Sequence, residues 1–216
     1  MTVPIPSYAL MESSTGPLAS LEIVLSFLEQ RGGLGVNPGH HRRVRELSLQ
    51  LGWMLGLSAT ELSHLSTAAL FHDIGQLALP DGLLRTPGRL TPSDYEIVKT
   101  HPLHSLQILQ PVIQEEPILL AIRHHHEQYG GGGYPDKLMG DQIPHLARLL
   151  AVPEVFDAMV HRRPWREPLT VEKVRELVAQ YRGTLFDPQI IDAFMNIDRQ
   201  WLLDYFSEPS AGRTEG

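Results

Sequence analysis

Residues 58–75 read SATELSHLSTAALFHDIG, and this stretch decides the fold. It begins with Ser58 and has Glu61 three positions later, which is the capping box that opens an α-helix. Small and apolar residues then recur at helical spacing. They are Leu62, Leu65, Ala69 and Leu70. The stretch therefore predicts a buried helix that ends near Gly75.

Helix starts of the same kind occur on both sides of this stretch. Asn37 followed by Pro38 predicts an N-cap and a first helical residue, and Thr91, Thr170 and Asp187 predict further starts. No sustained run alternates apolar and polar residues, so no strand is predicted. The predicted helices cover about 18–30, 37–56, 58–75, 91–110, 114–128, 145–161, 170–182 and 187–206. The fold class is therefore all-α, a single helical bundle over residues 17–206.

The bulk properties set limits on the function. A chain of 216 residues suits one domain with small appendages, and residues 1–16 and 207–216 are predicted to be flexible tails. The chain has no export signal at its start and no apolar run long enough to span a bilayer, so we expect a cytoplasmic protein without a membrane partner. The net charge of −7 disfavours binding to a nucleic-acid polymer, and an anionic substrate would need a local positive site such as a metal.

The chain has no cysteine but 11 histidines, so a transition-metal site would have to use imidazole and carboxylate. The first candidate is His72 with Asp73 at the end of the predicted buried helix. Adjacent helical residues point about 100° apart, so this pair could approach one metal from two sides, and the carboxylate could bridge two metals. A histidine favoured by the helix dipole and followed by a polar stop is the competing interpretation.

A second candidate is the run His124-His125-His126-Glu127, which precedes four glycines and the segment Gly133-Tyr134-Pro135. Two of these imidazoles could reach a metal pair, but three neighbours cannot all face the core, so at least one is a bystander. The glycines allow a close approach of backbone to a ligand. A solvated helix end followed by a flexible turn explains the same residues without a function.

Taken together, a series of ordered segments resembles the HD-GYP family of phosphodiesterases, whose usual substrate is cyclic di-GMP. The segments are HHRRV (40–44), HDIG (72–75), LT (90–91) before HP (101–102), HHE (125–127), GYP (133–135), VFDA (155–158), RPWR (163–166) and FDP (186–188). The resemblance covers about residues 36–195. It implies an HD-domain helical bundle that holds two, sometimes three, metals in its core.

The resemblance also assigns roles to residues. It implies the metal ligands His40, His72, Asp73, His101, His125 and His126, with Glu154 in place of the usual Asp. Asp73 would bridge the two metals, and Asp73 and Gln76 would be the catalytic positions. The substrate would be held by Gly133, Tyr134, Arg163, Arg166 and Gln76. Iron or manganese is the metal that the resemblance favours, although zinc or nickel also suits such ligands. A metal-bridging hydroxide would then cleave cyclic di-GMP to pGpG, GMP or both.

Several positions depart from the family pattern, three of which bear on the metals or the substrate. Gln76 stands where the family usually has Lys, and the loss of a charge predicts weaker substrate binding or slower turnover. Glu154 is one methylene longer than Asp and follows Pro153, and a kink at this proline is predicted to let Glu154 still reach the metal. Val36 cannot supply the ligand that binds a third metal in some members, so two metals are predicted.

The other histidines have no role in this pattern and are predicted to be surface or helix-packing residues. They are His41, His64, His104, His124, His145 and His161. Three functions remain open. The first is an active cyclic di-GMP phosphodiesterase, the second is a degenerate member that binds nucleotide or protein as a signalling module, and the third is a phosphohydrolase for another nucleotide. The expected partners are a cyclic dinucleotide and either a second copy of the chain or a signalling protein.

Overall fold

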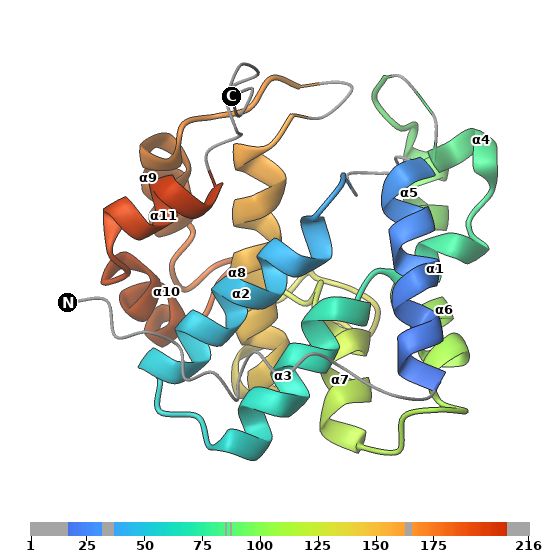
Figure 1. Ribbon diagram of the computed structural model, residues 1–216. Helices are drawn as coiled ribbons and strands as arrows, with labels where there is room; N and C mark the ends of the chain where they lie inside the picture. Colours follow the sequence, from blue (N-terminus) through green and yellow to red (C-terminus); the bar gives the residue numbers. More distant parts are fainter. Residues whose placement is uncertain (1–16, 32–36, 85, 87, 163–165, 207–216) are drawn as a thin grey trace, which may run out of the picture.

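The computed structural model describes residues 17–31, 37–84, 86, 88–162 and 166–206, and this part of the chain is helical (Figure 1). No strand occurs in these residues, although an isolated bridge joins Arg182 to Phe186. The all-α prediction is therefore confirmed. None of the helices in these ranges has the length and apolarity that a membrane span requires. The predicted tails, 1–16 and 207–216, lie outside the described residues.

Four helices pack together at the centre of the bundle. They are α2 (His40–Met54), α3 (Ala59–Phe71), α7 (Glu116–His124) and α8 (His145–Val160), and Figure 1 shows α2 and α3 running in front of α8. Their facing sides carry fully buried apolar side chains, among them Leu47, Leu65, Ile122 and Phe156. Burying such side chains contributes about 1.5–3 kcal/mol each, which makes this contact the core of the domain.

The remaining elements flank this core on two sides (Figure 1). On one side lie α1 (Pro17–Arg31), η2 (Ile74–Ala78), α4 (Asp81–Leu84), α5 (Pro92–Val98) and α6 (His101–Leu109). On the other side lie α9 (Val171–Gln180), α10 (Pro188–Met195) and α11 (Arg199–Phe206), and the short η3 (Gly140–Gln142) precedes α8. The C-terminal helices cover the end of α8 with aromatic contacts, in which Phe156 meets Phe194 and Phe206 edge to face.

Several predicted helix starts are confirmed by their capping bonds. Ser58 and Glu61 form the predicted capping box at the start of α3. The side chains of Thr91, Thr170 and Asp187 each accept a backbone N–H in the first turn of α5, α9 and α10. These caps bond only residues two or three positions away, so the local sequence is sufficient to place them.

The predicted N-cap of α2 is wrong. The helix begins at His40 with Gly39 at the N-cap position, in the left-handed region at φ 79°. The carbonyl of Asn37 instead accepts a hydrogen bond from the amide of His40, which closes a turn ahead of the helix. The side chain of Asn37 accepts a bond from the guanidinium of Arg43, so it is not free to cap the first turn.

Some predicted helices were too long. The predicted helix 91–110 is two helices that meet at Thr100, because Pro102 has no amide hydrogen and is accommodated in the first turn of α6. The predicted helix 187–206 is also two, with Asp198 accepting a bond from the amide of Trp201 at the start of the second. The helix over the histidine run ends at His124, and α3 ends at Phe71. These breaks place several candidate ligands at helix ends.

Candidate metal centre

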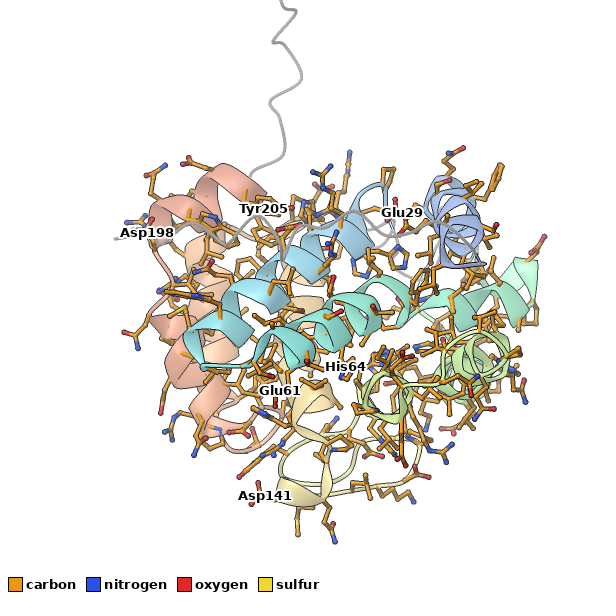
Figure 2. The ribbon with its side chains drawn as sticks, turned by 60° about the horizontal axis from the view of Figure 1, so that its bottom comes forward. Glu29, Glu61, His64, Asp141, Asp198 and Tyr205 are labelled. Atoms are coloured by element: carbon orange, nitrogen blue, oxygen red, sulfur yellow. The ribbon has the colours of Figure 1, made fainter. Side chains whose placement is uncertain are left out.

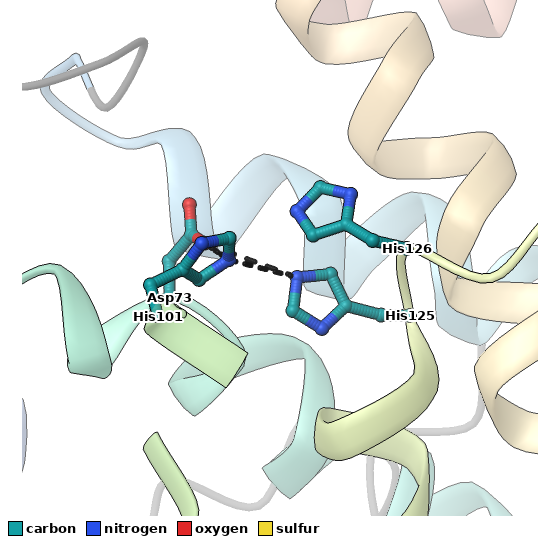
Figure 3. A group of neighbouring side chains, drawn as sticks. All are labelled: Asp73, His101, His125 and His126. Atoms are coloured by element: carbon teal, nitrogen blue, oxygen red, sulfur yellow. Dashed lines mark hydrogen bonds and ion pairs between the residues drawn. The ribbon is translucent and has the colours of Figure 1, made fainter. Parts of the chain in front are cut away.

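Asp73 lies at the junction of α3 and η2, and candidate ligands surround it. Its carboxylate forms one group with His101, His125 and His126 (Figure 3) and a second group with His40 and His72. Within each group the donor atoms all lie within 4.8 Å of one another. The structure therefore brings together six of the seven predicted ligands, from α2, the α3–η2 junction, α6 and the end of α7.

The two oxygens of Asp73 face different groups. Oδ1 lies 3.1 Å from Nε2 of His101 and 3.9 Å from Nε2 of His125. Oδ2 lies 3.6 Å from Nε2 of His72 and 3.9 Å from Nε2 of His40. One carboxylate thus stands between two sets of imidazoles and offers one oxygen to each.

Hydrogen bonds fix the orientation of four of these rings. Nδ1 of His72, His101 and His125 lies 2.6–2.9 Å from the backbone carbonyl three residues earlier. A carbonyl oxygen can only accept, so Nδ1 carries the hydrogen in each ring. Nδ1 of His40 likewise lies 2.7 Å from Oδ2 of Asp157. In the neutral rings Nε2 is then unprotonated, and its lone pair points toward Asp73. A histidine that ligates a metal needs such a free lone pair.

The electrostatics of this centre fit a bound cation. Burial lowers the pKa of His40 and lowers those of His72, His125 and His126 further, so the neutral rings are favoured. Burial would raise the pKa of the Asp73 carboxyl, but the surrounding imidazoles, His72 foremost, hold it well below its usual range. Nε2 of His72 is buried without a hydrogen-bond partner among the described residues. Lone pairs converging on an ionised carboxylate repel one another unless a positive ion lies between them.

Gly75 explains how Asp73 comes close to His101. A Cβ atom at residue 75 would overlap the backbone carbonyl of His101 and the amide of Ser105. The hydroxyl of Ser105 donates to the carbonyl of His72 at 2.8 Å and accepts from the amide of Gly75 at 2.8 Å. The absent side chain and this pair of bonds hold η2 directly against α6.

Asp157 was not among the predicted site residues, although it lies in the VFDA segment. It is fully buried on α8, and its oxygens bond His40, Arg43 and His161. Burial would raise its pKa, but the bonds from His161, His40 and Arg43 lower it well below the usual value. Asp157 is therefore an ionised carboxylate that orients His40 from behind. The motif contained this residue, but only the contact with α2 gives it a role.

Glu154 lies at the edge of the centre. Its Oε1 atom is 3.7 Å from Nε2 of His126, but among the described residues it belongs to neither group of close donor atoms. Tyr134 stacks on His126 with ring centroids 4.7 Å apart and planes inclined at 27°. Burial, with the nearby charge of Glu154, raises the pKa of Tyr134 far above its usual range, so its hydroxyl stays protonated.

The Gly-Tyr-Pro loop is packed against the ligand segment. A Cβ at Gly133 would lie 2.5 Å from the amide nitrogen of Gln128 and 2.6 Å from the carbonyl oxygen of His126. The absence of a side chain at Gly133 therefore allows these two segments of backbone to pack in contact. The same carbonyl of His126 accepts a bond from the amide of Tyr134 at 3.3 Å. The sequence predicted that the glycines allow a ligand to approach the backbone closely. At Gly133 the group that approaches closely is another segment of the backbone.

Charged contacts anchor the far side of this loop. The carboxylate of Asp136 bonds Arg123 and lies 2.8 Å from Nε2 of His124. The carboxylate of Glu127 accepts the amides of Asp136 and Leu138. His124 is thus the member of the histidine run that stands outside both groups of candidate ligands.

Only some of the residues predicted to bind substrate lie in the described part of the chain. Gln76 is buried in η2, and its Oε1 has no hydrogen-bond partner among the described residues. Arg166 donates to the carbonyl of Ala158 at 2.5 Å. Arg163 and Val36 lie outside the described residues. Of the remaining histidines, only His41, His124 and His161 are buried.

Comparison with known proteins agrees with this geometry. A family model described as "HD domain" matches residues 34–190, which is most of the chain. This chain belongs to the HD domain family. The match begins before the first candidate ligand and ends after the last, so the whole centre lies inside the family domain. The resemblance to the HD-GYP phosphodiesterases is confirmed at the level of the family.

Curated relatives carry related names. The cyclic di-GMP phosphodiesterase response regulator RpfG of Xanthomonas campestris is 41% identical over 144 residues, 65% of this chain and 38% of that protein. A cyclic di-GMP phosphodiesterase of Thermotoga maritima is 35% identical over 165 residues, 74% of this chain and 44% of that protein. A 3′3′-cGAMP-specific phosphodiesterase 2 of Vibrio cholerae is 32% identical over 160 residues, which are 72% of this chain and 30% of that protein. The chain spans less than half the length of these relatives.

Solved structures share the fold. A cyclic GMP-AMP-specific phosphodiesterase of V. cholerae has a TM-score of 0.67 at 19% identity, over 87% of this chain and 50% of that one. The HD domain of the phosphodiesterase PgpH of L. monocytogenes, in complex with cyclic-di-AMP, has a TM-score of 0.59 at 17% identity. The match covers 87% of this chain and 98% of that one. At these identities the likeness establishes the HD-domain bundle and nothing finer.

Proposed function

We propose that this chain is a metal-dependent phosphodiesterase that hydrolyses cyclic di-GMP to pGpG, GMP or both. The observation that carries the proposal is the position of Asp73, whose two oxygens face two separate sets of Nε2 lone pairs. Such a centre suits two divalent cations held side by side. The names of the relatives supply the substrate class, because RpfG and the Thermotoga protein are both cyclic di-GMP phosphodiesterases.

The residues of the chain divide the work in this proposal. One cation would be held by His40, His72 and Asp73, and the other by Asp73, His101, His125 and His126. Glu154 would complete the second set from the side of His126. When bound, such a metal pair supplies the Lewis acidity that makes water nucleophilic at neutral pH and offsets charge on the phosphate. Imidazole and carboxylate ligands suit iron or manganese, and also zinc or nickel.

The substrate would enter beside Tyr134. The ring of Tyr134 packs on His126 and keeps its proton, so it presents an aromatic face and a hydroxyl donor next to the centre. We assign Gly133 and Tyr134 to the wall of the substrate site and Gln76, Arg163 and Arg166 to the phosphates. Guanidinium groups suit phosphate because their paired N–H donors match two of its oxygens. A cytoplasmic location and a homodimeric or signalling partner belong to the same proposal.

A second candidate keeps the fold but not the turnover. Gln76 brings no charge to the position where the resemblance expects Lys, and its Oε1 has no hydrogen-bond partner among the described residues. A domain with this substitution could bind nucleotide without cleaving it. Another cyclic dinucleotide is the third candidate, since one relative at 32% identity is specific for 3′3′-cGAMP.

One experiment separates these candidates. The protein is purified without air in the presence of iron or manganese, its metal content is measured, and its hydrolysis of cyclic di-GMP and 3′3′-cGAMP is followed by chromatography. We expect about two metals per chain and hydrolysis of cyclic di-GMP. D73N should lose most of the metal and at least about 100-fold in rate. D141N, which changes an exposed carboxylate in η3 (Figure 2), should match the wild type.

The possible results have distinct meanings. Tight nucleotide binding without product selects the signalling module. Faster cleavage of 3′3′-cGAMP changes the substrate but keeps the reaction. A protein that holds no metal under any of these conditions contradicts the proposal as a whole.

A further inference from the structure

Helix α2 carries His40 as its first residue, yet it begins without a cap of its own. Its N-cap residue is Gly39, which has no side chain to accept a hydrogen bond from the first turn. The first amides of a helix have no partner within the helix and favour a negative charge nearby. The amides on either side of His40 therefore need an acceptor from another part of the fold.

The carboxylate of Glu29 on α1 is that acceptor. Its Oε2 accepts the amide of Gly39 at 2.9 Å. Its Oε1 accepts the amide of His41 at 3.2 Å and lies 2.9 Å from Nδ1 of the same residue. One side chain thus holds the backbone on both sides of His40.

The ring of His41 extends this contact to the metal centre. His41 is 2% exposed, and its ring centroid lies 5.2 Å from that of His40 and 5.6 Å from that of His72. Its Nε2 is buried without a hydrogen-bond partner among the described residues, so Glu29 is the polar group that orients the ring. The ring of His41 therefore packs beside two candidate ligands, His40 and His72, and is held in place by Glu29 of α1.

The packing between α1 and α2 makes this contact important. An open pocket of about 360 Å³ lies beside the two helices and is lined by Glu22, Leu25, Glu29, His41, Arg42 and Arg45, among others. The hydrogen bonds of Glu29 are therefore a direct polar link between the helices beside this pocket. Figure 2 shows Glu29 between α1 and the start of α2, where its hydrogen bonds join them.

We propose that Glu29 is a positioning residue of the metal centre, which acts through Gly39 and His41 to hold His40 at ligand distance from the cation shared with His72 and Asp73. The proposal rests on the metal-binding part of the proposed function. It adds α1, which contributes none of the candidate ligands, to the parts of the chain on which metal binding depends.

The test compares two glutamates that cap helices. Glutamine at position 29 keeps the size of the side chain but loses its charge and one acceptor oxygen. The matched control is E61Q, because Glu61 accepts the amide of Ser58 at the start of α3 and lies well away from Glu29 (Figure 2). The affinities of wild type, E29Q and E61Q for Mn²⁺ and Zn²⁺ are measured by competition with a coloured chelator, without any assay of hydrolysis.

We expect E29Q to weaken one of the two metal-binding steps about tenfold, at the lower end of what supporting residues contribute to metal affinity. E61Q should lower thermal stability but leave both affinities within about twofold of wild type. If E29Q does not fold, as judged by circular dichroism, H41F takes its place, because it removes the ring nitrogens and keeps Glu29. Its expected loss is the same.

Unchanged metal affinity in the folded variant, or equal losses in E29Q and E61Q, overturns this inference while the proposed function stands. A wild-type protein that binds no metal overturns both. The two failures are therefore distinguished by the wild-type measurement alone.

Discussion

Nδ1 of His40 lies 2.7 Å from Oδ2 of Asp157, a residue 117 positions later in the chain. The bond joins the first turn of α2 to the last turn of α8 and turns Nε2 of His40 toward Asp73. Arg43 and His161 share the same carboxylate, so Asp157 holds three donors that converge from two helices.

D157N should therefore damage metal binding and stability together. Asparagine has one acceptor oxygen for three donors and leaves the partly buried guanidinium of Arg43 without its ionic partner. We expect metal affinity at the His40 side to fall about 10–100-fold. The free energy of unfolding should fall by about 3 kcal/mol, as for other broken buried pairs. Chelator competition and urea denaturation measure the two effects.

The control for this variant is D187N. Asp187 is also buried, bonds Arg148 at 2.7 Å and caps α10, but it touches none of the candidate ligands. The D187N variant should have a lower free energy of unfolding and the metal affinity of the wild type. If both variants lose metal to the same degree, the loss reflects general destabilisation, and Asp157 has no specific role in orienting His40.

G75A should separate η2 from α6. The added Cβ overlaps backbone atoms of His101 and Ser105, which cannot rotate away as a flexible side chain would. The expected cost is about 3 kcal/mol, the upper part of the usual range for overpacking, together with weaker metal binding because Asp73 moves from His101. Thermal unfolding with and without Mn²⁺ measures both.

Gly82 provides the comparison, because a Cβ there meets nothing within 4 Å. G82A should be neutral or slightly stabilising, since alanine favours the helix more than glycine does. Wild-type stability in G75A would show that the η2–α6 contact yields easily, against our interpretation.

The anchor of the Gly-Tyr-Pro loop should depend on pH. The bond from Arg123, together with that from His124, lowers the pKa of Asp136 to about 2, below the value of about 3.8–3.9 expected in an unfolded chain. A lowered pKa in the folded state means that the ionised carboxylate stabilises the fold. The contribution is complete above the unfolded value and is lost as the pH falls through about 4 toward 2.

The difference in unfolding free energy between wild type and D136N should follow this course. It should be constant at neutral pH and shrink toward zero in acid, where both side chains are uncharged. Because Asp136 is partly exposed, the difference should be modest, about 1 kcal/mol or less. A difference that stays the same from pH 6 to the acid limit of folding would contradict the assignment.

Q76K should test the position at which the chain departs from its family pattern. If Gln76 faces a substrate phosphate, a lysine there adds a charge-assisted bond, roughly twice as strong as the neutral bond that it replaces. We expect KM for cyclic di-GMP to fall several-fold with little change in metal content. Q76L, of similar size and without a donor, should raise KM. Equal KM values in all three proteins would place residue 76 away from the substrate.

Part of the centre could be predicted because motifs mark it. The paired His72 and Asp73 and the histidine run identified candidate ligands, and the structure places six of the seven predicted ones in two close groups. Glu154 is the exception: its Oε1 lies 3.7 Å from Nε2 of His126, outside both groups of close donor atoms found among the described residues. Glu29 and Asp157 could not be assigned, because each acts through a bond to a distant segment.

By itself, the sequence determined the all-α class and most helix starts, because capping and apolar spacing involve residues within a turn of one another. Only the tertiary structure decided where the helices break, which imidazoles face Asp73 and what holds them. Those features depend on contacts between segments far apart in the chain, such as Gly75 against α6 and Asp157 against His40, and no local pattern records which surfaces will meet.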